Sequence, residues 1–441
     1  MRSRRPIVLV VGGGFAGLAA ARALRGADAD VALLDRQNHH VFQPLLYQVA
    51  TASLSPANIS APIRSTLRGV GACQVVLANV VGVDVEAKRV LVDEGSVPYD
   101  YLVLAAGVRH DYFGRDEWAG VAPGLKTIED ATEIRRRMLL AFESAEHEGD
   151  AASRRAALTF AIVGGGPTGV ELAGAIKGIA SKTLPKEYRN IDTTTARVIL
   201  FEGGPRLLGG FPEASSQRAL QDLERMGVEV RLGALVSDVR TDAVVVGDET
   251  IGVQNVFWAA GVKASPIAET LGAPLDRAGR VIVGEDLSVP DRPEIFVVGD
   301  LASFTPEGSG RALPGVAQVA MQMGKHAGGV IREEIAGRGA AARARAFRYR
   351  DRGSMAVIGK NRAIAVLGEK EFSGFVAWSL WACVHVAFLV GFRNRLRVML
   401  SWVFNWVWNS HDARLIVGEA KLRVRQPEGP GFEPAERPPG S

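Results

Sequence analysis

The chain opens with an apolar run that predicts a buried strand. Residues Ile7–Val11 are leucine or β-branched, as in a strand covered on both faces of a parallel sheet. A glycine-rich turn follows, and the alanine-rich stretch Leu18–Leu24 predicts a helix. A second apolar run, Val31–Leu34, ends at Asp35. The pattern therefore predicts a strand, turn, helix and strand in that order.

The glycines of this turn have a spacing with a chemical meaning. Gly12, Gly14 and Gly17 form a G-x-G-x-x-G pattern. The first glycine permits a tight turn, the second lets a pyrophosphate approach the backbone, and the third lets helix and strand pack closely. A carboxylate at Asp35 can accept hydrogen bonds from a ribose. We expect a dinucleotide site here; the alternative is a glycine turn that serves packing alone.

The same pattern occurs again about 150 residues later, which favours a duplicated unit and two bound dinucleotides. The terminal acid would bind a ribose 2′-hydroxyl and repel a 2′-phosphate, so it favours NADH over NADPH, although Arg206 lies nearby in the sequence. The second copy comprises a strand (Leu158–Val163), three glycines (Gly164, Gly166 and Gly169), a helix (Val170–Ile179) and a strand (Arg197–Phe201) that ends at Glu202.

Three further strand ends carry small or acidic residues. Ala105–Gly107 and Ala259–Gly261 would let the backbone pass close to a cofactor. Asp300 ends a third apolar run and could bind the ribityl chain or pyrophosphate of a flavin; its alternative role is a helix N-cap. The helix predicted next carries Gln318 and Gln322, which are four residues apart and so share a face.

The C-terminal part is apolar and rich in tryptophan. Residues Phe372–Phe392 are long enough to cross a bilayer, but they include Gly, Ser and His, and arginines follow at once. Five of the seven Trp lie within residues 378–408, where Trp favours the headgroup level. We expect an interfacial helix; a buried dimer or interdomain helix pair is the alternative. The next helix has a narrow polar stripe at Asn394, Arg397, Ser401, Asn405 and Asn409.

Composition narrows the function classes. A length of 441 residues predicts two or three domains, and 47% apolar residues with 23% charged indicate a globular protein. No Lys/Arg stripe interleaves with aromatics, so nucleic acid is not an expected partner. Only Cys73 and Cys383 occur, without C-x-x-C, which excludes thiol–disulfide exchange. The seven histidines form no metal-binding pattern, and we expect no metal.

Together these motifs resemble the type II NADH:quinone oxidoreductases. The resemblance covers roughly Pro6 to Gly418. The segments that carry it are Gly12–Gly17, Asn38–Thr51, Gly164–Glu171, Val298–Asp300, Leu313–Gln322 and the Trp-rich tail that ends near Ile416.

The resemblance implies an α/β fold with two Rossmann-like dinucleotide-binding domains, as in glutathione reductase, and a C-terminal amphipathic-helix region that anchors the protein to a membrane. The expected division is 1–150 and 281–335 for FAD, 151–280 for NADH, 336–420 for membrane anchoring and dimerisation, and 421–441 as a disordered tail. It also implies a non-pumping homodimer, peripheral on the cytoplasmic face of the cell inner membrane. Electrons would pass from NADH through one FAD to a membrane quinone, menaquinone or ubiquinone.

The resemblance also implies site residues. Glu171 would be catalytic near the nicotinamide and flavin, or it would only cap backbone amides. Gln318 and Gln322 would orient the quinone carbonyls. NADH would be held by Gly164, Gly166, Gly169, Glu171, Glu202 and Gly261. FAD would be held by Gly12, Gly13, Gly14, Phe15, Ala16, Gly17, Asp35, Val80, Gly107, Asp300, Ala317 and Gln318.

Two other functions stay open from the residues. A sulfide:quinone oxidoreductase shares the double-domain plan, but it needs cysteines beside the flavin, and neither Cys73 nor Cys383 suits that role. A flavin-binding protein that uses NADH only to switch its association state would not need the glutamine pair or the interfacial tail. Quinone-dependent turnover separates it from an enzyme.

Overall fold

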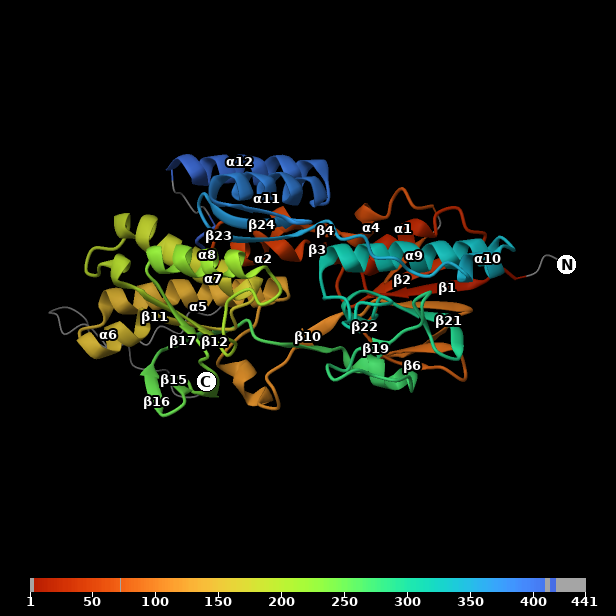
Figure 1. The fold of residues 1–441 in the computed structure, drawn as a ribbon, viewed down its shortest axis with the longest axis horizontal. Coiled ribbons are helices and arrows are strands. Elements are labelled where there is room, and N and C mark those ends of the chain that lie inside the picture. Colours follow the sequence, from red (N-terminus) through yellow and green to blue (C-terminus); the bar gives the residue numbers. More distant parts are fainter. Residues whose placement is uncertain (1–3, 72, 409–412, 418–441) are drawn as a thin grey trace, which may run out of the picture.

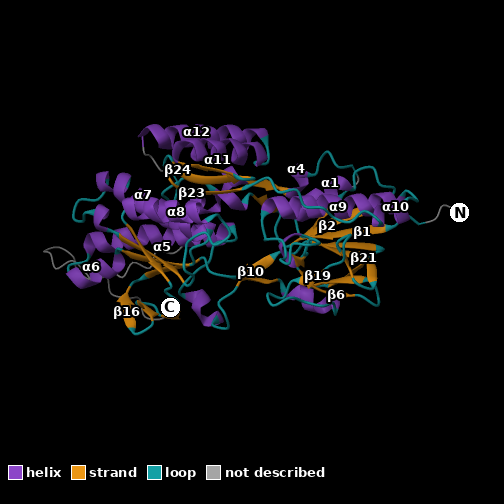
Figure 2. Ribbon diagram, in the orientation of Figure 1, coloured by secondary structure: helices purple, strands orange, loops and turns teal. Residues whose placement is uncertain are grey.

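The computed structural model describes residues 4–71, 73–408 and 413–417. They form two α/β lobes, joined by a narrow β-ribbon and bridged by a C-terminal sheet and helix pair (Figure 1). In the view of Figure 2 the main helices lie along one side of the strands in both lobes. This arrangement confirms the predicted α/β fold with two dinucleotide-binding units.

The first lobe is built on a six-stranded sheet in the order β20-β21-β9-β1-β2-β5. Strands β21, β9, β1, β2 and β5 are parallel, and β20 is antiparallel at the edge. β1 is fully apolar and lies between β9 and β2, with Val8 opposite both Tyr101 and Val31. The strands are β1 (Ile7–Val11), β2 (Asp30–Asp35), β5 (Gln74–Leu77), β9 (Tyr101–Leu104), β20 (Ser288–Val289) and β21 (Arg292–Val297).

Two helices that are distant in sequence, α1 (Phe15–Ala23) and α9 (Ala317–Ile335), pack together on this sheet (Figure 1). Glycine permits the contact, because a Cβ atom at Gly324 would lie 2.0 Å from the carbonyl oxygen of Ala16. The short α10 (Gly339–Arg343) follows α9. The start of α9 is thus fixed against the first glycine turn.

The second lobe has a four-stranded parallel sheet in the order β13-β12-β11-β17. Its core includes Phe160 and Phe257, whose rings stack with centroids 6.5 Å apart. The strands are β11 (Thr159–Val163), β12 (Arg197–Glu202), β13 (Val228–Leu232) and β17 (Asn255–Trp258). The helices are α5 (Ile128–His147), α6 (Ala151–Ala157), α7 (Pro167–Lys182) and α8 (Glu213–Arg225).

The chain crosses between the lobes through an antiparallel ribbon, β10 (Val108–His110) with β18 (Val262–Ala264). Both crossings come earlier in the chain than the predicted boundaries at 150 and 280, and α5 and α6 already belong to the second lobe. Two small sheets have two strands each: β3 (His39–Val41) with β4 (Ser60–Pro62), and β19 (Val281–Ile282) with β22 (Ala302–Ser303). Two others have three strands each: β6 (Val80–Asp84), β7 (Arg89–Val92) and β8 (Gly95–Pro98), and β14 (Val236–Val239), β15 (Ala243–Val246) and β16 (Glu249–Gly252).

The C-terminal part is a three-stranded antiparallel sheet covered by a helical hairpin (Figure 1). The apolar stretch that is long enough to cross a bilayer forms a helix of 15 residues, because the chain turns before α12 begins. Among the described residues, no helix combines the length and hydropathy that a span requires. The elements are β23 (Ser354–Gly359), β24 (Arg362–Leu367), β25 (Lys370–Ser373), α11 (Gly374–Phe388) and α12 (Phe392–Trp408). Asn409 and the tail 421–441, predicted to be disordered, lie outside the described residues.

The remaining short segments surround the predicted sites. The aromatic and amide-rich stretch after β2 forms β3 and then a helix, α2 (Leu46–Ala50), buried against α5 and α7. The others are α3 (Pro56–Ile59), α4 (Ile63–Thr66) and the 3₁₀ turns at Gln43–Leu45, Asp116–Gly120, Leu184–Lys186, Thr193–Thr195, Pro266–Leu271 and Gly299–Leu301.

Candidate functional site

The first glycine turn has the geometry of a dinucleotide site. Gly12 has φ +102°, and a Cβ atom at Gly17 would lie 1.8 Å from its carbonyl oxygen, so α1 packs onto β1 only with glycine there. Gly14 differs, because a Cβ atom built on it would have no heavy atom within 4 Å. It is the N-cap of α1, and Phe15 and Ala16 form the first helical positions. The open space at a helix N-terminus fits a pyrophosphate.

The acid after β2 completes this turn. Asp35 Oδ2 accepts a hydrogen bond from the Gly13 amide at 2.5 Å, and Oδ1 accepts one from the Gln37 amide at 2.7 Å. The carboxylate is therefore held at the edge of the glycine turn, where a ribose would lie. Val80 begins β6 close by, since the Ala78 amide bonds the Asp35 carbonyl at 2.9 Å.

The second turn repeats these features. A Cβ atom at Gly169 would lie 1.8 Å from the Gly164 carbonyl oxygen, whereas one at Gly166 would have no atom within 4 Å. Glu202 Oε2 accepts from the Gly165 amide and Oε1 from the Gly204 amide, each at 2.6 Å. Both lobes thus have a bridging carboxylate beside an open glycine. This geometry is the structural counterpart of the sequence duplication.

Each turn faces a glycine at the end of a neighbouring strand. Gly107 follows β9 with φ +68°, and a Cβ atom there would have no atom within 4 Å. Gly261 follows β17 with φ +80°, and the exposed ring of Phe113 covers it, with Cζ 2.6 Å from an ideal Cβ atom. Phe113 itself has a strained φ of 53°. No motif in the sequence predicted that an aromatic ring covers Gly261.

Asp300 lies at the first lobe beside the start of α9. Burial raises the pKa of its carboxyl, while Lys126 and Arg280 lower it. Among the described residues no group hydrogen-bonds this carboxylate, and a Cβ atom at Gly315 would lie 3.1 Å from its Cγ. A desolvated carboxylate without a hydrogen-bond donor fits a ligand that supplies hydroxyl groups. The residues present therefore fit FAD at this lobe.

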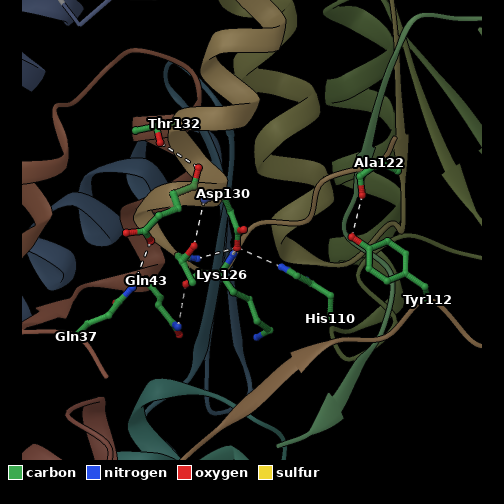
Figure 3. Close-up of polar contacts among 10 residues, drawn as sticks. Gln37, Gln43, His110, Tyr112, Ala122, Lys126, Asp130 and Thr132 are labelled. Carbon is green, nitrogen blue, oxygen red and sulfur yellow. Dashed lines mark hydrogen bonds and ion pairs between the residues drawn. The ribbon is translucent and has the colours of Figure 1, made fainter. Parts of the chain in front are cut away.

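Lys126, beside Asp300, is a further candidate residue that no sequence motif predicted. Burial lowers its pKa, and the charge of Asp300 raises it. The loop of Lys126 is held by hydrogen bonds where the two lobes meet (Figure 3). Asp130 Oδ2 accepts from the Lys126 amide at 2.9 Å and pairs with His110 Nε2 at 3.2 Å. Gln43 Nε2 donates to the Lys126 carbonyl at 3.3 Å. A single lysine in a loop belongs to no periodic pattern, so the sequence does not indicate its place near a site.

Glu171 lies in the first turns of α7, directly after the second glycine turn. Burial raises the pKa of its carboxyl to about 8, against a smaller opposing effect of the Val357 amide. That amide donates to Oε1 at 3.4 Å from β23. Burial raises the pKa of the Tyr47 phenol on α2, and the charge that Glu171 carries when ionised raises it further. Glu171 is therefore largely protonated at neutral pH.

The predicted glutamine pair lies at the start of α9, with both amides bound to main chain. Gln318 Nε2 donates to the Gly353 carbonyl at 2.8 Å, and its Oε1 accepts from the Arg352 amide at 3.1 Å. Gln322 binds the carbonyl and the amide of Arg350, both at 3.0 Å. Ala317 begins the helix. The structure thus brings the pair together, beside the segment that enters β23.

The tail helix docks onto α2 and α3 through its polar stripe. Asn394 Nδ2 donates to the Ser60 carbonyl at 3.0 Å, and Asn405 Nδ2 to the Ser53 carbonyl at 3.4 Å. Trp402 Nε1 donates to Gln48 Oε1 at 2.7 Å, and Gln48 Nε2 donates to the Tyr47 hydroxyl at 3.0 Å. Asn394 and Asn405 of the polar stripe therefore face the protein, whereas Arg397 and most apolar side chains of α12 are exposed.

Family models match both parts of this arrangement. The model described as pyridine nucleotide-disulphide oxidoreductase matches residues 6–324, and the NDH2 C-terminal domain matches residues 352–409. Together they cover the two lobes and the C-terminal sheet with its helices.

Curated relatives are similar over nearly the whole chain. The type II NADH:quinone oxidoreductase Ndh of Mycobacterium tuberculosis is 44% identical, over 96% of this chain and 93% of its own length. The type II NADH:quinone oxidoreductase NdhA of the same organism is 41% identical, over 93% and 89%.

Solved structures support the fold. NDH2 from Plasmodium falciparum in complex with NADH has a TM-score of 0.85 at 19% identity and covers 94% of this chain and 100% of its own. The sulfide:quinone oxidoreductase of Aquifex aeolicus has a TM-score of 0.70 at 18% identity, with 91% and 96% covered. At these identities the likeness extends to the fold alone, so the relative at 44% identity decides between the two functions. The chain therefore belongs to the type II NADH:quinone oxidoreductases, flavoproteins that transfer electrons from NADH to a quinone.

Proposed function

We propose that the two glycine turns divide the reaction between the lobes, with FAD at the first and NADH at the second. FAD, when bound, accepts a hydride from NADH and passes two electrons to a quinone. The repeated geometry, in which Asp35 and Glu202 each bridge backbone amides beside an open glycine, supports two dinucleotides. The observation that supports FAD at the first lobe is the desolvated carboxylate of Asp300, which lies at this lobe alone. Glu202 holds a ribose 2′-hydroxyl and disfavours a 2′-phosphate.

In this proposal the first lobe positions FAD from several elements. Gly12–Gly17 receives the pyrophosphate at the N-terminus of α1, and Asp35 with Val80 borders the ribose. Asp300, desolvated and without a hydrogen-bond donor among the described residues, accepts from the ribityl hydroxyls. Gly107 and Ala317 let main chain pass close to the ring system. NADH is held by Gly164, Gly166, Gly169, Glu202 and Gly261.

Glu171 is the proposed proton donor for the quinone. The net reaction, NADH + H⁺ + quinone → NAD⁺ + quinol, takes up one proton beyond the hydride of NADH. A carboxyl with a pKa of about 8 still carries a proton for this purpose at neutral pH. Glu171 follows the NADH turn on α7, beside β23 and Tyr47 of α2, and the segment that enters β23 is bonded to the start of α9. Gln318 and Gln322 belong to the same side of the site.

The direct test adds NADH and then a short-chain quinone to the oxygen-free holoprotein. We expect the flavin absorbance to fall with NADH and to return with the quinone. Retained bleaching after the quinone is added would contradict the second half of the proposal.

We also propose that α11 and α12 attach the protein to a membrane surface. Large apolar side chains of α12 point outward: Phe392 is 81% exposed, Leu400 59% and Val403 58%. Contiguous exposed apolar side chains of this kind mark sites where a protein contacts a membrane or another protein. Arg393 and Arg397 at its start suit anionic headgroups. Because Asn394 and Asn405 hold α12 against the protein from its other side, this apolar face is free to enter the interface.

Charging this face should release the protein from lipid. The double variant Leu400→Asp/Val403→Asp should bind phosphatidylcholine–phosphatidylglycerol vesicles at least about tenfold more weakly, because two carboxylates would have to enter the interface. Cosedimentation measures this, with the exposed Val81→Asp on β6 as the matched control. The predicted homodimer is the competing use of this face. Wild-type protein that stays in solution as a dimer, with a monomeric double variant, would contradict membrane attachment.

A further inference from the structure

Residues 350–353 connect the first lobe to the C-terminal sheet. This segment runs along α9, and two glutamine side chains hold it by four hydrogen bonds of 2.8–3.1 Å. Each glutamine uses its amide nitrogen as a donor and its oxygen as an acceptor. This pattern replaces the main-chain partners that a neighbouring strand would supply.

The end of the segment has little freedom. Gly353 has φ +91°, and a Cβ atom there would lie 2.2 Å from the Val366 carbonyl oxygen on β24. The next residues form β23, which packs closely on α7: a Cβ atom at Gly174 would lie 1.8 Å from the Ile358 carbonyl oxygen. β23 is therefore fixed at its entrance by α9 and along its length by α7.

Glu171 lies between these two contacts. It is three residues before Gly174 on α7, and its Oε1 accepts from the Val357 amide in the middle of β23. Among the described residues, the charge of Glu171 shifts the pKa of Tyr47 on α2. The hydrogen-bonded route from the start of α9 to Glu171 thus consists of main chain only, from residue 350 to residue 357.

We propose that Gln318 and Gln322 are positioning residues, which clamp the entrance of β23 and thereby hold the Val357 amide and the dry environment of Glu171. The inference rests on the proposed role of Glu171 as proton donor, and it gives the glutamine pair a different task from direct hydrogen bonds to the quinone. Their amides already have backbone partners, and a quinone carbonyl could take a donor only by displacing one of them.

The test replaces both amides by a side chain of similar size. In Gln318→Met/Gln322→Met, the amides of residues 354–359 should exchange hydrogen about tenfold faster or more, because the entrance of β23 loses its partners. Water should then reach Glu171 more easily, and burial affects the pKa of this carboxyl more than the Val357 hydrogen bond does. The upper pH limit of quinone turnover should therefore move down from about 8. The KM for quinone should change less than kcat.

Two further variants distinguish loss of the clamp from a general destabilisation of the fold. Lys325→Met lies on the exposed side of the same helix and should leave exchange and pH profile unchanged. If the double variant does not load FAD, the single Gln322→Met loosens only the partly exposed bonds to Arg350 and should show the same changes more weakly.

The opposite pattern overturns the clamp. A raised KM for quinone, with exchange in 354–359 and the pH limit unchanged, would show that the amides bind the substrate directly. If neither the hydrogen exchange of residues 354–359 nor the kinetics changed, the glutamines would neither clamp β23 nor bind the quinone. A wild-type protein that fails to reduce quinone at all would instead refute the proposed function, and exchange in 354–359 would still report on the clamp.

Discussion

Replacing Glu171 by glutamine should slow quinone turnover about 10²-fold while leaving FAD content unchanged. The expected size is that of a lost general acid. The wild-type rate should hold up to about pH 8 and fall above it, because the carboxyl then loses its proton. The amide cannot ionise, so Glu171→Gln should lose this limb of the profile. Steady-state rates at saturating NADH over pH 6–9.5, with FAD content from absorbance, measure both effects.

The stability of the fold gives a second, independent measurement on this variant. The pKa of Glu171 is raised in the folded state above the ordinary value of 4.5. Wild-type stability should therefore fall, relative to that of Glu171→Gln, as the pH rises from about 4.5 to 8, and the difference should then level off. Glu213→Gln, an exposed carboxylate at the start of α8, is the matched control. Turnover that is unchanged in Glu171→Gln would rule out the proton-donor role.

Two alanine substitutions in the first glycine turn should have different effects on stability and on FAD binding. Gly17→Ala places a Cβ atom 1.8 Å from the Gly12 carbonyl oxygen, so α1 must move off β1. We expect a lower melting temperature, a stability loss of about 1–3 kcal/mol or more, and loss of FAD. Gly14→Ala adds a methyl group where the protein has no atom within 4 Å, at a φ of −73° that alanine tolerates. This variant should fold normally and bind FAD weakly, because the methyl takes the place of the pyrophosphate.

The FAD-to-protein ratio and the melting temperature after FAD removal separate these outcomes. Gly166→Ala is the matched variant in the other lobe, where an added Cβ atom also meets no protein atom. It should keep its FAD and show a raised KM for NADH. Normal FAD affinity in Gly14→Ala would mean that the first turn does not hold the pyrophosphate.

Local sequence patterns predicted those parts of the candidate site whose geometry depends on residues close together in the sequence. The strand Ile7–Val11 was predicted with its observed bounds, and both glycine turns with their terminal acids lie as the motif requires. In such a unit the strand, turn and helix are consecutive in the chain. Their geometry follows from backbone sterics and the period of the apolar residues.

Long-range partners could not be predicted in this way. Asn394 and Asn405 in the polar stripe of α12 donate to the carbonyls of residues 60 and 53, more than 300 positions away, and no local pattern indicates such partners. The partners of Gln318 and Gln322 are main-chain groups, which carry no sequence signature. The lobe crossings at β10 and β18 resemble ordinary strands, whereas the turn near residue 150 has the composition of a hinge.

The electron path itself is tested most directly by an anaerobic absorbance titration of the purified, FAD-loaded protein. NADH should bleach the flavin bands, and a short-chain quinone should restore them promptly, with one NADH oxidised per flavin. Sulfide in place of NADH should leave the bands unchanged. Bleaching by NADH without reoxidation by quinone would contradict the account and point to an NADH-switched binding protein, and bleaching by sulfide but not by NADH would refute the NADH site of the second lobe.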